Sequence, residues 1–271
     1  MTELFGRAYE LTIGTRKIVG LRVSFEIEKS LSREPNTAKI GIYNLSQDTR
    51  DRIAFQVDAP VQLRAGYGDE LEDLFLGDAT NITSEYSAPD WITTVESGDG
   101  VNAIRRGRIS RSFAPGTKIK EILKAAAECA GAKIGNALKK ADAGDVAGTL
   151  QEFSGGRVLS GQCFPKLNEL AGSLGYGVSI QNGELQLLAL DETTTDQVVV
   201  LDAETGLIGS PHRSEKGRWQ AVSLLHPGLA PGRRVKIRAT EIEGIFRVEQ
   251  TKYTGDTHGE AWFAELEVKS I

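Results

Sequence analysis

The stretch Val61-Gln62-Leu63-Arg64-Ala65 resembles a second stretch, Val235-Lys236-Ile237-Arg238-Ala239, far along the same chain. In both, an apolar residue stands at every second position. This alternation is typical of a strand that buries one face and exposes the other to water. The similarity suggests that one kind of β unit occurs twice in the chain.

The residues that follow these two stretches support a repeat. An aliphatic–Phe pair comes after each stretch, with Phe75 in the first and Phe246 in the second. A tryptophan lies 16 residues after each Phe, at Trp91 and Trp262. We therefore interpret the chain as two related β-barrel or sandwich units. The alternative is that any two three-stranded meanders share such short matches.

Most of the chain before residue 101 and after residue 197 alternates in the same way. The 30 glycines favour many turns, as all-β folds require. Ser46 can cap a short helix over residues 47–54, which ends before Pro60. The predicted strands cover residues 21–28, 37–43, 60–67, 72–86, 90–97, 219–225, 233–239, 244–254 and 259–271.

The middle of the chain has a different character. Apolar residues at helical spacing predict helices over residues 118–130 and 165–174. The pair Asn182-Gly183 between two alternating runs predicts a type I′ hairpin over residues 176–189. Residues 136–156 have few large apolar side chains and are expected to form an exposed loop or frayed helix.

These patterns predict a mainly β protein with an α+β insert. The expected domains are a first β-barrel domain over residues 1–101, an α+β insert domain over residues 102–189, and a second β-barrel domain over residues 190–271. The two barrels are expected to be related to each other.

Composition excludes several classes of protein. The chain has 271 residues with 32 Lys and Arg against 37 Asp and Glu, and hence a net charge of −5. An acidic chain is a poor candidate for a dedicated nucleic-acid binder, whose affinity comes largely from neutralised phosphates. The apolar runs are far shorter than the roughly 20 residues that span a bilayer, and the N-terminus lacks a secretory pattern.

Nucleophilic catalysis requires a Ser or Cys beside a base. The sequence holds no G-x-S-x-G motif, and Cys163 would have to be combined with His212, His226 or His258. We expect Cys163 to be a buried, unactivated residue instead. With Cys129 as its one companion, it makes no disulfide framework, and the chain fits a reducing compartment.

Metal and cofactor sites are not predicted either. Two cysteines and three scattered histidines lack zinc spacing, and the acidic residues 69–73 lack the ligand pattern of a calcium loop. Residues 98–103 match G-x-G-x-x-A, but an Asp inside the turn would repel a pyrophosphate. The basic cluster is interpreted as a solvated strand or linker; it comprises Arg105, Arg106, Arg108 and Arg111. Nothing supports a glycosidase pair of carboxylates, and no catalytic, cofactor-binding or metal-binding residue is assigned.

Several segments resemble the baseplate (tail) hub proteins of tailed bacteriophages. The opening Ala38-Lys39-Ile40-Gly41-Ile42-Tyr43-Asn44-Leu45-Ser46 is similar to the strand and short helix of that family's first barrel. The C-terminal similarity lies in residues 206–211, 219–235, 244–248 and 254–262. One departure is His226, where many relatives carry Asn before the Pro.

The resemblance implies a homotrimer in which each subunit supplies two barrels. Six barrels would form a pseudo-hexameric ring that joins the six-fold tail tube to a three-fold spike or central fibre. Its neighbours would be a tail tube or distal tail protein above and the spike below, and also baseplate wedge and tape-measure proteins. DNA would pass through the lumen. The protein would be made in the host cytoplasm, be part of the virion, and not be an enzyme.

Two physical expectations accompany this hypothesis. Edge strands of the barrels should pair or pack between subunits, because exposed edges otherwise promote aggregation. The lumen should be polar and not strongly basic, since a ring of Lys and Arg would hold the phosphates of passing DNA. The insert at residues 102–189 should lie on the outside or at the distal rim, where it can hold neighbouring proteins.

Three other functions remain open from the sequence. The chain could be a muralytic tail-tip enzyme, a carbohydrate-binding β-sandwich, or a hexameric distal-tail or tube protein. The number of copies in the assembly separates the hub, with three, from the last two, with one and six.

Overall fold

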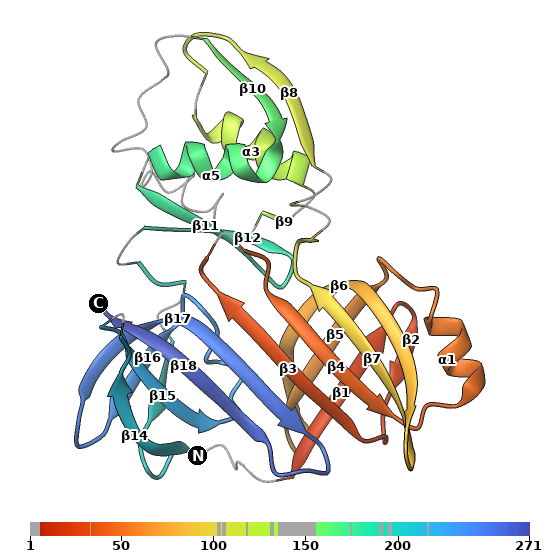
Figure 1. Cartoon of the computed structure of the whole chain (residues 1–271). Helices are drawn as coiled ribbons and strands as arrows, with labels where there is room; N and C mark the ends of the chain where they lie inside the picture. Colours follow the sequence, from red (N-terminus) through yellow and green to blue (C-terminus); the bar gives the residue numbers. More distant parts are fainter. Residues whose placement is uncertain are drawn as a thin grey trace. The chain divides into compact units, whose positions relative to one another are not determined.

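A computed structural model describes residues 6–32, 34–101, 104, 107–117, 119–130, 133–134, 156–173, 175–189, 192–194, 197–215 and 217–271. The chain divides into two compact units, which are described separately (Figure 1). Unit 1 combines Met1–Ser30, Asn36–Asp99 and Thr193–Ile271, and unit 2 combines Leu31–Pro35 and Gly100–Glu192. The fold is mainly β with a smaller α+β part, as the sequence predicts.

Unit 1 contains one sheet of 13 strands. A short helix, α1 (Gln47–Ile53), lies between two of them, and the Ser46 side chain caps it by accepting a hydrogen bond from the Thr49 amide. The strands are β1 (Arg7–Ile13), β2 (Arg16–Ile18), β3 (Val23–Ser30), β4 (Thr37–Tyr43), β5 (Pro60–Tyr67), β6 (Glu70–Ser87), β7 (Asp90–Gly98), β13 (Val198–Leu201), β14 (Leu207–Arg213), β15 (Trp219–Leu224), β16 (Arg234–Arg238), β17 (Glu243–Asp256) and β18 (Trp262–Ser270).

The sheet consists of two groups of strands with the same order. In what we call the first module the order is β3-β4-β7-β6-β5-β1, and in the second module it is β14-β15-β18-β17-β16-β13. Figure 1 shows the first group in red to yellow and the second in teal to blue. The modules differ at one end, because β1 pairs antiparallel with β5 whereas β13 pairs parallel with β16.

The registers of the two modules also correspond. The β6–β7 ladder contains a bulge between Ala79 and Asn81, and the β17–β18 ladder contains one between Val248 and Gln250. Beyond the bulge, both ladders continue to a tryptophan at the start of the last strand. Bulges are specific features of a sheet, so their matching positions identify a structural repeat rather than a chance similarity of meanders.

One detail of the expected repeat is wrong. Phe246 lies opposite Val235 in the second module. When the two ladders are aligned at their bulges, the residue equivalent to Phe246 in the first module is Gly77, which lies opposite Val61. Phe75 pairs instead with Leu63, two residues further along β5. The common spacing from Phe to Trp therefore does not reflect equivalent positions, because a strand shows the same face every two residues and a shift by two preserves the pattern.

The two modules meet where β3 pairs antiparallel with the second half of β17. We call this pairing the internal seam. Its buried side contains Phe25 and Ile27 of β3 with Tyr253 of β17, all at most 3% exposed. The apolar residues of both modules belong to one continuous core cluster. The seam is therefore part of the core.

Unit 2 is the α+β part. Helices α3 (Ile119–Ala130) and α5 (Cys163–Ser173) pack on each other and on short strands around a small core of their own. The hairpin is confirmed, because Asn182 and Gly183 have φ of 53° and 75°, as a type I′ turn requires. The strands are β8 (Arg108–Phe113), β9 (Lys133–Ile134), β10 (Arg157–Gln162), β11 (Tyr176–Gln181) and β12 (Glu184–Ala189).

The cysteines differ from expectation. Cys163 is fully buried, as predicted, but it forms a disulfide with Cys129 that joins α5 to α3. Spacing in the sequence did not reveal this bond, because the two helices bring the residues together only after folding. No helix in the described ranges is long and apolar enough to cross a membrane.

The predicted insert spanned residues 102–189, and unit 2 covers Gly100–Glu192 together with the short segment Leu31–Pro35. The separation of unit 1 into two barrel domains stays a prediction. The loop expected at residues 136–156 lies outside the described residues except for Gly156.

Candidate functional site

One face of the sheet in unit 1 carries rows of charged side chains. Opposite residues on neighbouring strands share a face, and one such row runs through Glu26, Lys39 and Glu96 of the first module. A parallel row in the second module joins Lys252 to Glu265 and, across the internal seam, to Glu28. The opposite face of these strands is the apolar core.

Ion pairs connect the two modules on this polar face. The Lys252 ammonium lies 2.7 Å from the Glu26 carboxylate and 3.6 Å from that of Glu28. The hydrogen bond to Glu26 is the main reason why the pKa of Lys252 is raised. Exposed pairs of this kind contribute at most about 1 kcal/mol each, so they define the register of the seam more than its strength.

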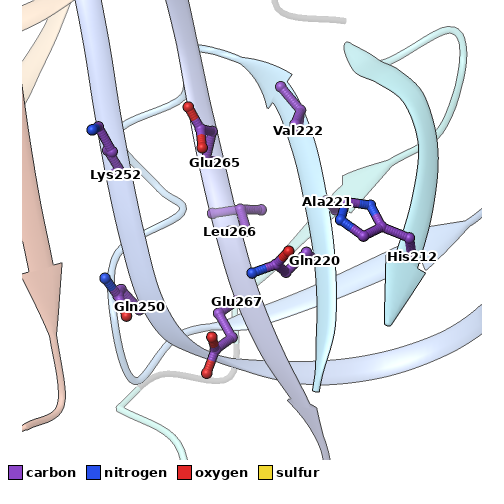
Figure 2. Close-up of a pocket in the computed structure, with 9 residues that line it drawn as sticks. All are labelled: His212, Gln220, Ala221, Val222, Gln250, Lys252, Glu265, Leu266 and Glu267. Carbon is purple, nitrogen blue, oxygen red and sulfur yellow. The ribbon is translucent and has the colours of Figure 1, made fainter. Parts of the chain in front are cut away.

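A small hollow on the polar face lies in the second module (Figure 2). Figure 2 shows its side chains projecting from neighbouring strands, with His212 on the outermost of them. Its volume, about 190 Å³, is below the roughly 300 Å³ of ordinary small-molecule sites. The lining residues are His212, Gln220, Ala221, Val222, Gln250, Lys252, Glu265, Leu266 and Glu267.

This hollow lacks the geometry of a catalytic site. Lys252 is bound to carboxylates of the seam, and Glu267 accepts a hydrogen bond from Arg218. A general base needs a reacting group within hydrogen-bonding reach. Lys252 and Glu267 are instead each paired with an oppositely charged residue outside the hollow. Among the described residues, no group of three or more His, Cys, Asp or Glu could hold a metal ion.

The histidines considered for catalysis lie on three separate elements of unit 1. His212 is on the outer strand β14, and His258 is in the β17–β18 turn. His226 follows β15; its Nδ1 accepts a hydrogen bond from the Gly228 amide, and burial lowers its pKa. Cys163 cannot serve as a nucleophile while it is bonded to Cys129.

The other weighed motifs are structural. Asp99, in the glycine turn after β7, is fully buried and accepts a hydrogen bond from Asn36. A buried carboxylate at this position is incompatible with a bound pyrophosphate. Asp73, in the acidic stretch, accepts a hydrogen bond from Gln62. Of the basic cluster, Arg108 and Arg111 are exposed on β8, and the other two arginines lie outside the described residues.

The sequence predicts that edge strands pair between subunits, but it does not locate the two edges. β14 has a neighbour on one side only, β15, and the last seven residues of β6 have β7 as their only neighbour among the described strands. Alternation of apolar and polar residues reports the faces of a strand but not its edges. The only signal in the sequence is the exposed aromatic pair that flanks the β6–β7 turn, Tyr86 and Trp91.

Comparisons with known proteins agree with this architecture. The model of the family described as Baseplate hub gp41 matches residues 10–268. A search of curated protein sequences finds no match.

Solved structures of similar fold include two tail proteins and a component of a type VI secretion system. A tail protein from Neisseria meningitidis MC58 is 10% identical with a TM-score of 0.66, covering 98% of this chain and 97% of that one. The 43 kDa tail protein of prophage MuSo2 from Shewanella oneidensis is 11% identical with a TM-score of 0.67, covering 98% of each chain. The Escherichia coli c3393 protein, a type VI secretion component described as structurally similar to T4 tail proteins gp27 and gp5, is 11% identical with a TM-score of 0.60, covering 96% and 76%.

Proposed function

Because the chain belongs to the Baseplate hub gp41 family, and is thus a structural component of a bacteriophage tail, we propose that three copies form the ring of a baseplate hub. In this ring each chain supplies two modules, so that three copies present six similar modules. A ring of this kind can match a six-fold tail tube on one side and a three-fold spike or central fibre on the other.

The repeat within unit 1 carries this proposal. Both modules have the same strand order, and both ladders contain the bulge at the same position. A chain with a single module would need six copies to match a six-fold tube, whereas a chain with two needs three. The continuous sheet across the internal seam supports a ring wall in which neighbouring modules share strands.

The polar face of the sheet is the best candidate for the lumen wall. It carries the carboxylates of Glu26, Glu28, Glu96, Glu265 and Glu267. Its cations are partly neutralised, as Lys252 and Arg218 are in ion pairs. A surface with this balance repels phosphates rather than holding them, which suits DNA that must slide through without being retained.

The remaining roles follow from the same proposal. The neighbours would be a tail tube or distal tail protein, a spike or central fibre, and wedge and tape-measure proteins. Unit 2, whose bounds are similar to those of the insert domain predicted at residues 102–189, would contact these neighbours. Residues 1–101 and 190–271 would supply the two barrels. The protein would be made in the host cytoplasm and have no enzymatic activity.

Native mass spectrometry of the purified chain tests the proposal. We expect a complex of three copies. A complex of six would indicate a distal-tail or tube protein, and a monomer that binds glycans would indicate a carbohydrate-binding module; either result would contradict the hub. A zymogram on a cell-wall gel should show no clearing, since clearing would identify a muralytic enzyme.

A further inference from the structure

The two strand edges that form the internal seam each have a counterpart in the other module, and neither counterpart is paired with another described strand. In the seam, β3 pairs with residues 250–256 of β17. When the ladders of the two modules are aligned, β14 is the counterpart of β3. His212 of β14 lies opposite Gln220, in the position where Glu26 of β3 lies opposite Lys39. Residues 81–87 of β6 are in the same way the counterpart of residues 250–256 of β17.

The paired edges of β3 and β17 are more buried than their counterparts, β14 and the last residues of β6. In residues 250–256 of β17, buried side chains alternate with partly buried ones after the first position, whereas in residues 81–87 of β6 only Ile82 is buried. Four of the eight residues of β3 are buried, but in β14 only Pro211 is. Long strand edges without a cover are sites of association in natural proteins.

We propose that β14 of one copy pairs antiparallel with residues 81–87 of β6 of the next copy, in the register of the internal seam. The proposal rests on the ring described above and identifies the junction between its subunits. Transferring the register places Glu85 opposite His212 and Ser84 opposite Arg213. Tyr86 then lies opposite the bulge of β14, which contains Gly209 and Pro211.

Charges at this junction are complementary, with the opposite polarity to those of the internal seam. In the seam the acids Glu26 and Glu28 are on β3 and the base Lys252 is on β17. At the junction the acid Glu85 is on β6 and lies opposite His212 of β14, whereas Arg213 lies opposite Ser84 on the other face of the sheet. Complementary charges stabilise the correct pairing, and like charges directly opposite each other oppose a wrong one.

Side-chain sizes are also complementary, and the large residue is again on the opposite edge from the one that carries it in the seam. In the seam, the large Phe25 of β3 lies opposite Gly255 of β17, where an added Cβ would overlap the Phe25 ring. At the junction the large residue is Tyr86 on β6, and the small one is Gly209 in the β14 bulge. The internal seam and the junction thus each combine an aromatic side chain on one edge with a glycine on the other, as close packing requires.

An apolar patch lies at each of the two edges. The rings of Tyr86 and Trp91 contact each other at a tilt at the β6 edge, with 5.7 Å between ring centroids, and the two residues are 61% and 40% exposed. Ile208 on β14 is 44% exposed. Trp262, the counterpart of Trp91, is only 2% exposed in the internal seam. Covering Trp91 in the assembly would give the two tryptophans equivalent surroundings.

Disulfide trapping tests the register. In the doubly substituted Glu85→Cys/His212→Cys chain, the new cysteines should be directly opposite, about 4.5–5.5 Å apart between Cβ atoms, but in different copies. Mild oxidation should yield covalent dimers and trimers on a non-reducing gel. The matched control Thr254→Cys/Glu26→Cys occupies the same positions of the internal seam and should link within one chain. Asn81→Cys/His212→Cys, displaced by four residues, should not link.

Charge exchange tests the polarity. Glu85→Lys should raise the concentration needed for half-assembly by about tenfold, and Glu85→Lys/His212→Glu should recover most of this loss. Thr254→Lys, at the corresponding position of the internal seam, should leave assembly unchanged.

The outcomes separate this inference from the proposed function. Trimers that form without a link between residues 85 and 212, or that tolerate Glu85→Lys, would place the junction elsewhere and overturn the inference while the hub proposal stands. A chain that never forms trimers would overturn both.

Discussion

The ring of Phe25 meets the ring of Trp262 edge-on, with 5.4 Å between centroids and 68° between planes. Phe25 belongs to the first module and Trp262 to the second, so this contact holds the internal seam together. Trp262 is 2% exposed, whereas its counterpart in the first module, Trp91, contacts Tyr86 and the Arg50 guanidinium and is 40% exposed. The equivalent tryptophan is thus buried in one module and partly exposed in the other.

Removal of the Phe25 ring should destabilise unit 1 strongly. Phe25→Ala should lower the free energy of unfolding by about 3–5 kcal/mol, because a buried aromatic side chain is lost and a cavity remains beside Trp262. Urea unfolding followed by tryptophan fluorescence measures the effect. Tyr86→Ala, at the exposed edge, should cost less than about 1 kcal/mol at concentrations where the chain is monomeric. Equal losses for both variants would contradict the assignment of Phe25 to the seam.

Gly255 should not tolerate a larger side chain. Its backbone is not in the left-handed region, so an alanine would fail only because its Cβ overlaps the Phe25 ring. Gly255→Ala should therefore cost about 1–3 kcal/mol in urea unfolding. Phe25→Leu in the same chain should reduce that cost. Gly177→Ala is a control in a strand of unit 2, followed by circular dichroism because unit 2 has no tryptophan; there the new Cβ would make an ordinary 3.7 Å contact with the Leu188 carbonyl oxygen.

The buried amine of Lys29 should make stability depend on pH. Lys29 is 2% exposed and donates to the Leu74 carbonyl; burial lowers its pKa to about 8 from 10.5, although Asp99 opposes the shift. Between these two values the unfolded chain binds more protons than the folded one, so stability should rise with pH. The gain from about pH 7.5 to 9.5 should be about 2 kcal/mol.

Urea unfolding at the two pH values measures this gain, and Lys29→Met should abolish it. Lys252→Met is the control, because the pKa of Lys252 is raised and its titration lies above this range. A slope that persists in Lys29→Met would mean that another group produces it.

Reduction of the disulfide should affect unit 2 alone. Cys129 and Cys163 join α3 to α5, and their separation of 34 residues predicts a loss of about 2–4 kcal/mol on reduction. All three tryptophans, Trp91, Trp219 and Trp262, are in unit 1, whereas the long helices are in unit 2. A reductant should therefore move the helical transition in circular dichroism and leave the tryptophan transition in place. The Cys129→Ser/Cys163→Ala chain should show no response to reductant, and a shift of both transitions would show that the units unfold together.

Much of the architecture could be read from local patterns. The alternation at Val61 and at Val235 predicted the equivalent strands β5 and β16. Ser46 predicted the cap of α1, and Asn182-Gly183 predicted the β11–β12 hairpin. These signals suffice because each depends on residues close together in the chain. The alignment of Phe75 with Phe246 was wrong by two positions, since a period of two makes such shifts invisible in the sequence.

The sequence alone determined that this chain is a β protein built from a repeated unit, because the period of apolar residues and the turn residues are local properties. Only the tertiary structure decided which edges are covered and which are open. Whether β3 or β14 finds a partner depends on pairing between residues such as Glu26 and Lys252, from opposite ends of the chain. Such pairing follows from the closure of long loops and from packing against a common core, and no short stretch of sequence contains that information.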